Sequence, residues 1–166
     1  MTGVQTCALP IFSPDKEAPL QYLIPQDAFL SGEIIPWKKD RLPDLLDMDS
    51  DKKVGITRWK FLSDAMFRLE SGQHCFTWVE GERLRCCVWV RYADKNSTEK
   101  DDSSTPEKLI SLENGYCHAS AKDQLPAFLK RILITLSENK ENSPIRFQAK
   151  DELICRAMKA AGFQSV

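Results

Sequence analysis

The sequence predicts an α/β fold in which helices flank a mixed, mostly antiparallel central sheet. Three observations predict this class. An amphipathic helix, a hairpin and a further strand follow one another between residues 58 and 117. After them come a helix, a short strand and a last helix, so that helices and strands alternate. The chain of 166 residues is long enough to build one domain around a core of its own.

The composition is typical of a globular protein and argues against several classes of function. The chain is 42% hydrophobic and 28% charged, with a net charge of −1. No basic excess points to nucleic acid, and no apolar run approaches the about 20 residues that span a bilayer. Six cysteines without a CxxC pair, together with two histidines, argue against a metal site. We therefore expect a cytoplasmic protein with reduced thiols, no metal and no nucleic-acid partner.

Residues 1–11, MTGVQTCALPI, are expected to lie outside the domain. The segment has no charge and lacks the basic start and the long apolar core of a signal peptide. It resembles the translation of a common sequencing-library adapter. We therefore interpret it as an assembly artefact, with residues 12–166 forming the single domain and the natural N-terminus missing.

The stretch from Phe12 to Lys53 is rich in proline, so its regular elements must be short. Leu20–Ile24 is interpreted as an edge strand and Leu42–Met48 as one or two helical turns. Four aspartates follow at positions 44, 47, 49 and 51, but the glycine and the terminal glutamate of a calcium-binding loop are absent. We interpret this stretch as a solvated connection.

Arg58–Glu70 is the first predicted helix. Thr57 is placed to cap its start and Gly72 to end it. One apolar stripe at helical spacing is predicted to pack on the core, and it consists of Trp59, Leu62, Met66 and Leu69.

Cys75–Glu80 and Leu84–Tyr92 are predicted to pair as a hairpin in the middle of the sheet. Gly81 takes the first central turn position, as a type II′ turn requires. Cys86 and Cys87 are adjacent, so their side chains are expected on opposite faces of the second strand.

Residues 93–106 are almost purely polar and are predicted to form a mobile surface loop. Lys108–Cys117 is predicted to be a strand, in which Gly115 indicates a bulge or a close approach by another backbone or a ligand. A short polar loop then leads to a helix whose first turn accommodates Pro126. The buried face of this helix is predicted to be Leu125, Phe128, Leu129, Ile132, Leu133 and Leu136.

Ile145–Ala149 is predicted to be a short strand, followed by a helix that Asp151 caps and Gly162 ends. Phe163 is expected to pack back on the core. The apolar face of this last helix is predicted to be Leu153, Ile154, Ala157, Met158 and Ala161.

The candidate site lies in the strand, loop and helix between Leu109 and Leu136. A loop of this kind opens onto a helix N-terminus, where unpaired N–H groups and the helix dipole favour an anion. Cys117 beside the loop is a candidate nucleophile, but the nearest histidine in the sequence, His118, would project to the other side. A buried free thiol is the alternative, and the residues favour it.

Several segments, taken in order, resemble the GNAT superfamily of N-acetyltransferases. They are the hairpin strand in GERLRCCVWV, the strand that ends in YCHAS, and the terminal helix DELICRAMKAAGF, which is similar to the last helix of that family. The resemblance extends from Ile56 to Phe163. The helix in WKFLSDAMFRLESG and the strand around Trp89 more narrowly resemble acetyltransferase-like proteins found with bacterial exopolysaccharide genes.

The resemblance implies an N-acetyltransferase that uses acetyl-CoA as its acyl donor. The acceptor would be an amine of a small molecule, an amino sugar or a cell-envelope intermediate. The strands Lys108–Cys117 and Ile145–Ala149 would diverge near Cys117 and admit the pantetheine arm. Backbone groups near Tyr116, Cys117 and His118 would pair with that arm. The further cofactor-binding residues that the resemblance implies are Lys122, Asp123, Gln124, Leu125, Ala127 and Asp151.

The resemblance also implies a general base, for which Glu113 is the first candidate and Glu80 and Glu82 are alternatives. Tyr116 or His118 would donate a proton. Because acyl transfer from a thioester to an amine depends mainly on positioning and on a deprotonated amine, loss of one acid would slow the reaction without preventing it.

The chain departs from the family pattern in the loop from Lys122 to Ala127, which would hold the pyrophosphate. Asp123 and Leu125 stand where that family has glycines, and Pro126 lacks an N–H donor. Met158 replaces the family's usual general-acid tyrosine. These departures leave two alternatives open: a GNAT-shaped module that binds or assembles without catalysis, and an unrelated α/β binding domain. A homodimer is also left open.

Overall fold

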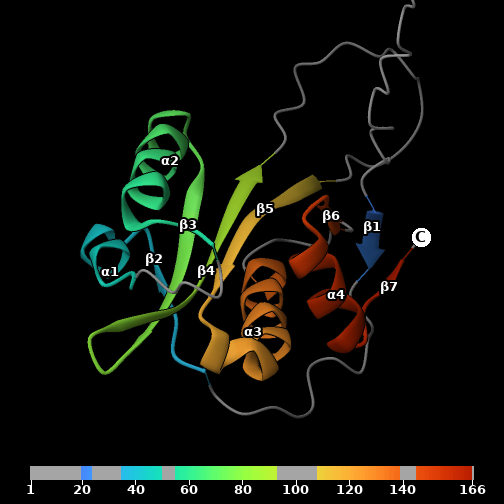
Figure 1. Ribbon diagram of the computed structural model, residues 1–166. Helices are drawn as coiled ribbons and strands as arrows, with labels where there is room; N and C mark the ends of the chain where they lie inside the picture. The colour runs from blue at the N-terminus through green and yellow to red at the C-terminus, as the bar shows by residue number, and fades with distance from the viewer. Residues whose placement is uncertain (1–19, 24–34, 50–54, 93–107, 139–144, 166) are drawn as a thin grey trace, which may run out of the picture.

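The described residues form a seven-stranded sheet, with α1 and α2 on one face and α3 and α4 on the other (Figure 1). The structure is a computed structural model and describes residues 20–23, 35–49, 55–92, 108–138 and 145–165. Its elements in chain order are β1 (Leu20–Leu23), β2 (Lys38–Lys39), α1 (Leu42–Leu46), α2 (Arg58–Glu70), β3 (His74–Glu80), β4 (Arg83–Tyr92), β5 (Lys108–Cys117), the 3₁₀ helix η2 (Ala119–Gln124), α3 (Leu125–Glu138), β6 (Ile145–Ala149), α4 (Glu152–Ala160) and β7 (Gln164–Ser165).

The strand order is β2-β3-β4-β5-β6-β1-β7. Neighbouring strands are antiparallel except β5 and β6, which are parallel because α3 carries the chain back across the sheet between them. This arrangement confirms the predicted mixed, mostly antiparallel sheet flanked by helices. The predicted hairpin of β3 and β4 lies inside the sheet, as expected from its apolar strands.

The sheet separates two apolar clusters. The larger cluster lies under α3 and α4 and contains Phe128, which is fully buried. The smaller cluster lies under α1 and α2, where Phe61 packs near Trp89. Cys86 belongs to the larger cluster and Cys87 to the smaller one, so these adjacent residues face opposite sides of β4 as predicted.

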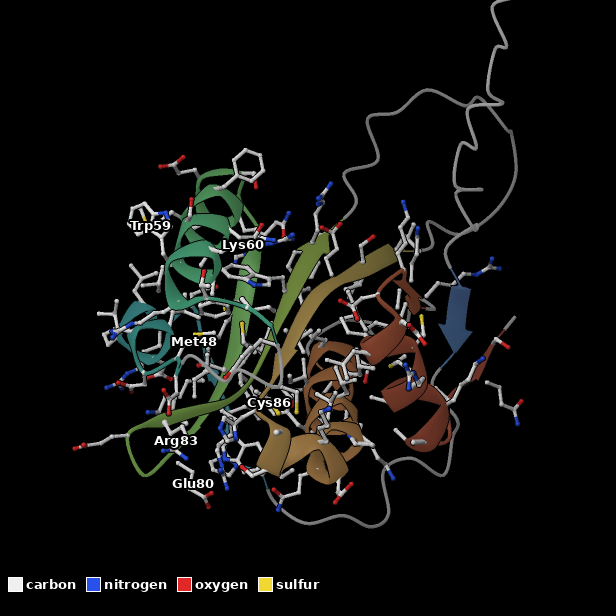
Figure 2. All side chains as sticks on the ribbon, viewed as in Figure 1. Met48, Trp59, Lys60, Glu80, Arg83 and Cys86 are labelled. Atoms are coloured by element: carbon white, nitrogen blue, oxygen red, sulfur yellow. The ribbon has the colours of Figure 1, made fainter. Side chains whose placement is uncertain are left out.

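The apolar stripe predicted for α2 is correct for Leu62 and Leu69, which pack partly buried against the smaller cluster, and wrong for Trp59 and Met66. Trp59 is 81% exposed and Met66 57% exposed, and Figure 2 shows Trp59 on the outer side of the helix. The face of α2 that is buried against the sheet consists of Phe61, Ala65 and Arg68. Both sets of residues recur at helical spacing, so the pattern alone did not decide which face is buried.

The helix ends agree with the prediction. The Thr57 hydroxyl oxygen accepts a hydrogen bond from the Lys60 N–H at 3.3 Å and caps α2. Gly72 and Gly162 follow the ends of α2 and α4 with positive φ, and Phe163 packs in the larger cluster. All six residues predicted for the buried face of α3 are buried.

The first strand has a different place in the sheet from the one predicted. β1 is a strand, but it does not lie at the edge, because it pairs with β6 on one side and with β7 on the other. The sequence did not reveal β7. Residues 1–11 and 93–106, for which we predicted an artefact and a mobile loop, lie outside the described residues.

The turn between β3 and β4 is of type I′ and not of the predicted type II′. Gly81 and Glu82 are its two central residues, and both have φ of 57°. Positive φ at both central positions defines type I′, whereas type II′ has it only at the first. The prediction failed because glutamate gives no sequence signal for a positive φ.

Asp44 is buried, which corrects the prediction of a solvated connection at this position. It is 3% exposed and accepts a hydrogen bond from the Thr77 hydroxyl at 2.8 Å. Arg41 and Lys38 lie 3.1 and 3.7 Å from the same carboxylate. Asp44 therefore ties α1 to β3. Asp51, the last of the four aspartates, lies outside the described residues.

Candidate functional site

The parallel pairing of β5 and β6 stops partway along β5. Its register runs from Lys108 opposite Ile145 to Leu112 opposite Ala149. β5 then continues to Cys117, paired with β4 on its other side. Past Ala149 the chain turns into α4. The pairing therefore ends at Leu112, before the predicted position at Cys117, because β6 itself ends at Ala149.

Gly115 lies in a β-bulge, which confirms the first of its two predicted explanations, whereas the close contact at this glycine comes from side chains of α4 and not from another backbone. The register of β4 and β5 shifts between Cys87 and Trp89, which leaves one extra residue in β5. A Cβ on Gly115 would lie 3.0 Å from Ile154 Cγ1 and 3.7 Å from Leu153 Cδ2. The group that approaches Gly115 is thus a pair of side chains from α4.

The polar loop predicted before α3 is a 3₁₀ helix, which corrects the expected position of the helix N-terminus. η2 runs from Ala119 to Gln124 and continues directly into α3, and the Leu125 N–H donates to the Lys122 carbonyl. The N-terminus of this continuous helical segment is therefore near Ala119, earlier than expected. His118 Nδ1 accepts a hydrogen bond from the Ser120 N–H at 3.3 Å and caps η2.

The residues predicted to hold the pyrophosphate have different environments. Lys122 and Asp123 are exposed, and Gln124 and Ala127 are half-buried. Leu125 is 2% exposed and belongs to the larger apolar cluster. An anion at this position would meet Lys122 as its cation, with the Asp123 carboxylate beside it.

Asp151 caps α4 with its own carboxylate. The side chain accepts hydrogen bonds from the Leu153 N–H at 2.8 Å and the Ile154 N–H at 3.3 Å. This confirms the predicted cap. The α4 N-terminus already holds a negative charge from its own chain, so it is poorly suited to bind a second anion.

Glu113 lies on the α2 face of the sheet within a cluster of charged groups. Its Oε2 atom is 3.2 Å from Arg68 and 3.0 Å from Arg91, and Gln73 donates to it at 3.5 Å. Arg68 also pairs with Asp64 at 2.7 Å. The cluster fixes the Glu113 carboxylate where a bound amine or ammonium group would meet a held negative charge.

Glu113 is the member of this cluster that the sequence indicated, and its partners Arg68, Gln73 and Arg91 were not predicted. Arg68 is 9% exposed and Gln73 5% exposed, and the Arg68 guanidinium lies 5.9 Å from the Trp89 ring centroid. The available signal was the recurrence of Phe61, Ala65 and Arg68 at spacings of four and three on one face of α2.

Tyr116 lies near the end of β5, and His118 directly follows that strand. Tyr116 is 2% exposed, packs on Phe61 with ring centroids 5.4 Å apart, and donates to the Asp49 carbonyl at 3.4 Å. His118 is half-buried, and its Nδ1 lies 2.7 Å from the Ser120 hydroxyl. His118 is therefore more exposed than Tyr116, and it can exchange a proton with solvent more readily.

Cys117 faces the opposite side of the sheet from Tyr116, with its Sγ atom 3.4 Å from Cys86 Sγ. The hydrogen bond from Cys86 lowers the pKa of the Cys117 thiol, and the charges of Lys122 and Arg85 act in the same direction. Burial and the charge of Asp123 oppose this shift. The same hydrogen bond, together with burial, raises the pKa of Cys86.

The alternative bases in the hairpin lie at its turn. Glu80 is exposed and lies 3.0 Å from the Arg85 guanidinium, and Arg83 follows the turn (Figure 2). Glu82 occupies the turn itself and is exposed. Among the described residues, the ionic partner of Glu80 is Arg85, so Glu80 does not belong to the Glu113 cluster.

Comparison with known proteins finds solved structures that resemble this chain, but no related sequence. No family model matches the sequence, and no curated protein matches it. An aminoglycoside 6′-N-acetyltransferase, AAC(6′)-IG from Acinetobacter haemolyticus, aligns with 14% identity and a TM-score of 0.48, covering 78% of this chain and 90% of that one. A predicted acetyltransferase from Clostridium acetobutylicum, solved with acetyl-CoA, aligns with 14% identity and a TM-score of 0.49, covering 79% and 90%.

These two solved structures are acetyltransferases, but at this level of similarity neither identifies a function for this chain.

Within the described residues, no group of three or more histidine, cysteine, aspartate or glutamate side chains could hold a metal ion. In the described part of the chain, no helix is both long enough and apolar enough to cross a membrane.

Proposed function

We propose that this chain is an N-acyltransferase that transfers an acetyl group from acetyl-CoA to an amine. The observation that carries the proposal is the end of the parallel pairing of β5 with β6 at Leu112 and Ala149. Beyond it, the described part of the chain gives the β5 backbone from Glu113 to Cys117 a strand neighbour only on the β4 side. An extended molecule that carries amide groups can pair with such an edge as an added strand does.

The pantetheine arm of CoA is a molecule of this kind, because it is a linear chain with two amide groups. In the proposal it lies along the open edge of β5 between Glu113 and Cys117. The pyrophosphate then lies at the start of η2, near Ala119, where the dipole of the helical segment favours an anion. Lys122 supplies the exposed cation.

The acceptor amine approaches on the α1 and α2 face in this proposal, because the Glu113 carboxylate faces that side. Arg68 and Arg91 hold Glu113 in one position, so it orients an ammonium group and accepts its proton or passes it to solvent. His118 is the proton donor to the departing thiolate, since it is less buried than Tyr116. A small-molecule amine, an amino sugar or a cell-envelope intermediate would serve as acceptor.

A second candidate function is binding without catalysis, and two contacts favour it. Ile154 lies against Gly115, so side chains of α4 cover one face of the strand that would hold the arm. Leu125 is buried where the GNAT family has a glycine that approaches the pyrophosphate. A protein that binds CoA thioesters and transfers nothing would have this arrangement.

Calorimetric titration with acetyl-CoA, followed by an amine panel, tests both candidates. We expect binding below millimolar ligand, and acyl transfer detected by mass spectrometry of the product amide. Binding without transfer to any amine would replace the first candidate by the second. No heat of binding at millimolar acetyl-CoA would overturn both and leave an α/β domain of another function.

Two pairs of variants test whether Lys122 takes part in binding acetyl-CoA and whether Glu113 takes part in catalysis. Lys122→Glu is expected to weaken acetyl-CoA binding about tenfold, or about 1.4 kcal/mol, because it reverses a charge near the pyrophosphate. Lys159→Glu makes the same charge change on exposed α4 and should leave affinity unchanged.

Glu113→Gln should lower kcat at least about tenfold with little effect on acetyl-CoA affinity, whereas Glu80→Gln should lower neither kcat nor affinity.

A further inference from the structure

The core contains two pairs of thiols at nearly equal separations. Cys86 Sγ lies 3.4 Å from Cys117 Sγ, and Cys75 Sγ lies 3.3 Å from Cys87 Sγ. The first pair lies in the apolar cluster under α3 and α4, and the second lies in the cluster under α1 and α2. All four thiols are free and buried. The sulfur separation alone therefore does not distinguish the two pairs.

The strand register distinguishes them. Cys86 stands directly opposite Cys117 in the antiparallel pair of β4 and β5. The His118 N–H donates to the Arg85 carbonyl at 2.8 Å, so the adjacent position is a hydrogen-bonded pair and Cys86 with Cys117 is a non-hydrogen-bonded pair. At such pairs the Cα atoms are about 4.5 Å apart, which lies within the range of about 4.4 to 6.8 Å that a disulfide spans.

Cys75 and Cys87 are diagonal neighbours. Cys75 stands opposite Trp89, and Cys87 stands opposite Thr77. Diagonal positions in an antiparallel pair have Cα atoms about 7 to 8 Å apart, at or beyond the limit of about 7 Å for a disulfide without backbone movement. The two thiols touch, but the strands hold them too far apart to be bridged.

The charges around the two pairs also differ. Cys117 ends β5 next to η2, and Arg85 and Lys122 lower the pKa of its thiol, in addition to the hydrogen bond from Cys86. For Cys87, burial raises the pKa, the hydrogen bond with Cys75 adds to that effect, and the charge of Arg68 opposes it without reversing it. Cys117 thus has more thiolate character than Cys87 at the same pH.

We propose that Cys86 and Cys117 are a redox-active dithiol, which hydrogen peroxide oxidises to a cross-strand disulfide between β4 and β5. The Cys117 thiolate attacks one peroxide oxygen, the O–O bond breaks, and the released hydroxide takes up a proton to form water. The Cys86 sulfur then attacks the sulfenic sulfur of Cys117. The S–O bond breaks, the S–S bond forms, and the hydroxyl group leaves with the Cys86 proton as a second water. Two thiols are oxidised and one peroxide is reduced to two waters.

The proposal is tested on the folded chain with Cys7 and Cys155 replaced by serine, so that only the four paired thiols remain. The protein is treated with stoichiometric hydrogen peroxide, denatured in an alkylating reagent, and digested with trypsin without reduction. Cleavage after lysine and arginine places Cys75 in peptide 69–83, Cys86 and Cys87 in peptide 86–91, and Cys117 in peptide 109–122. Mass spectrometry then identifies the linked peptides.

We expect peptide 86–91 linked to peptide 109–122, with a mass two hydrogens below the sum and with Cys87 alkylated in the fragment spectrum. Dithiothreitol should restore both free peptides. A link between peptides 69–83 and 86–91, a bond within peptide 86–91, or four alkylated thiols would each overturn the proposal. This readout needs no substitution of a buried thiol, so a failure to fold cannot mimic the result.

Two variants provide the matched control. Cys87→Ala should leave the link between peptides 86–91 and 109–122 intact, because Cys87 takes no part in it. Cys117→Ala should abolish every link to peptide 86–91 and leave Cys86 alkylated. A link to peptide 69–83 that appears in Cys117→Ala would mean that the register does not determine which thiols react.

Discussion

Glu82 has a backbone conformation that is unfavourable for a residue with a side chain. Its φ of 57° lies in the left-handed region, where a residue with a Cβ is disfavoured by about 1–2 kcal/mol. Glu82→Gly should therefore raise the free energy of unfolding by about 0.5–1 kcal/mol, after the greater chain entropy of glycine in the unfolded state is subtracted. Urea denaturation measures this change. Gly81→Ala, the reverse change one position earlier, should lower stability, and equal effects of the two variants would contradict the explanation.

Tyr92 gives the protein a predictable response to alkaline pH. Burial raises the pKa of its phenol above the ordinary value of 10.0, and the nearby Asp40 carboxylate raises it further. The unfolded chain therefore loses this proton at a lower pH than the folded chain does. The resulting stabilisation is complete below pH 10 and is lost as the pH rises through the pKa of the folded state. The urea midpoint should fall less steeply above pH 10 for Tyr92→Phe than for the unaltered chain, and parallel curves would exclude Tyr92 as the cause.

At the scale of elements, Gly115 determines how closely α4 approaches β5. A Cβ at this position would lie 3.0 Å from Ile154 Cγ1, which is closer than side chains pack without displacement. Gly115→Ala should therefore lower the free energy of unfolding by about 1–3 kcal/mol through overpacking. Ile154→Ala removes the atoms that would clash, so Gly115→Ala should cost much less in that background. Additive effects in this double-mutant cycle would mean that the glycine is required for another reason.

The orientation of α2 is a second property of an element that stability measurements can check. Phe61 is buried against the sheet and Trp59 is exposed, although both are large aromatic residues of one helix. Phe61→Ala should cost about 3 kcal/mol or more, and Trp59→Ala should change stability by less than about 0.5 kcal/mol. Equal losses for the two variants would mean that the helix is rotated toward its predicted stripe.

Helix ends were predictable because the interactions that set them are local. Thr57 and Asp151 bond to N–H groups two or three residues further along the chain, so the sequence around each cap contains the whole interaction. The type of the hairpin turn and the rotation of α2 were not predictable in this way. Each depends on a partner strand or on the sheet, and the local sequence around Glu82 and Trp59 was compatible with either outcome.

At the scale of the whole molecule, the candidate site combines what the sequence indicates with what only the fold reveals. The strand, the bulge at Gly115 and the helix after it were all indicated by local patterns. The polar stretch before α3 was expected to be a loop, because Lys122, Asp123 and Gln124 have no apolar periodicity that would indicate a 3₁₀ helix. The partners of Glu113 come from α2 and β4, and no spacing in the sequence relates them to β5.

The contact between Arg68 and Glu113 therefore joins α2, on the proposed acceptor side of the site, to β5, along which the pantetheine arm is proposed to lie. Arg68 belongs to α2 and Glu113 to β5, 45 residues further along, and their charged atoms lie 3.2 Å apart. Arg68 also contacts Asp64, Gln73 and the face of Trp89, so its side chain is almost surrounded. Removing it leaves the Glu113 carboxylate with only Arg91 as an ionic partner among the described residues.

Arg68→Ala should consequently lower the free energy of unfolding by about 3 kcal/mol, because a partly buried carboxylate loses one of its two guanidinium partners and the helix loses packing. Glu113→Gln keeps the shape and should cost less. In the double variant the losses should fall short of additivity by about 1 kcal/mol or more, which denaturation curves of the four proteins would measure. If the two losses simply add, α2 and β5 are held together by apolar packing alone, and Arg68 does not fix the position of Glu113 for an incoming amine.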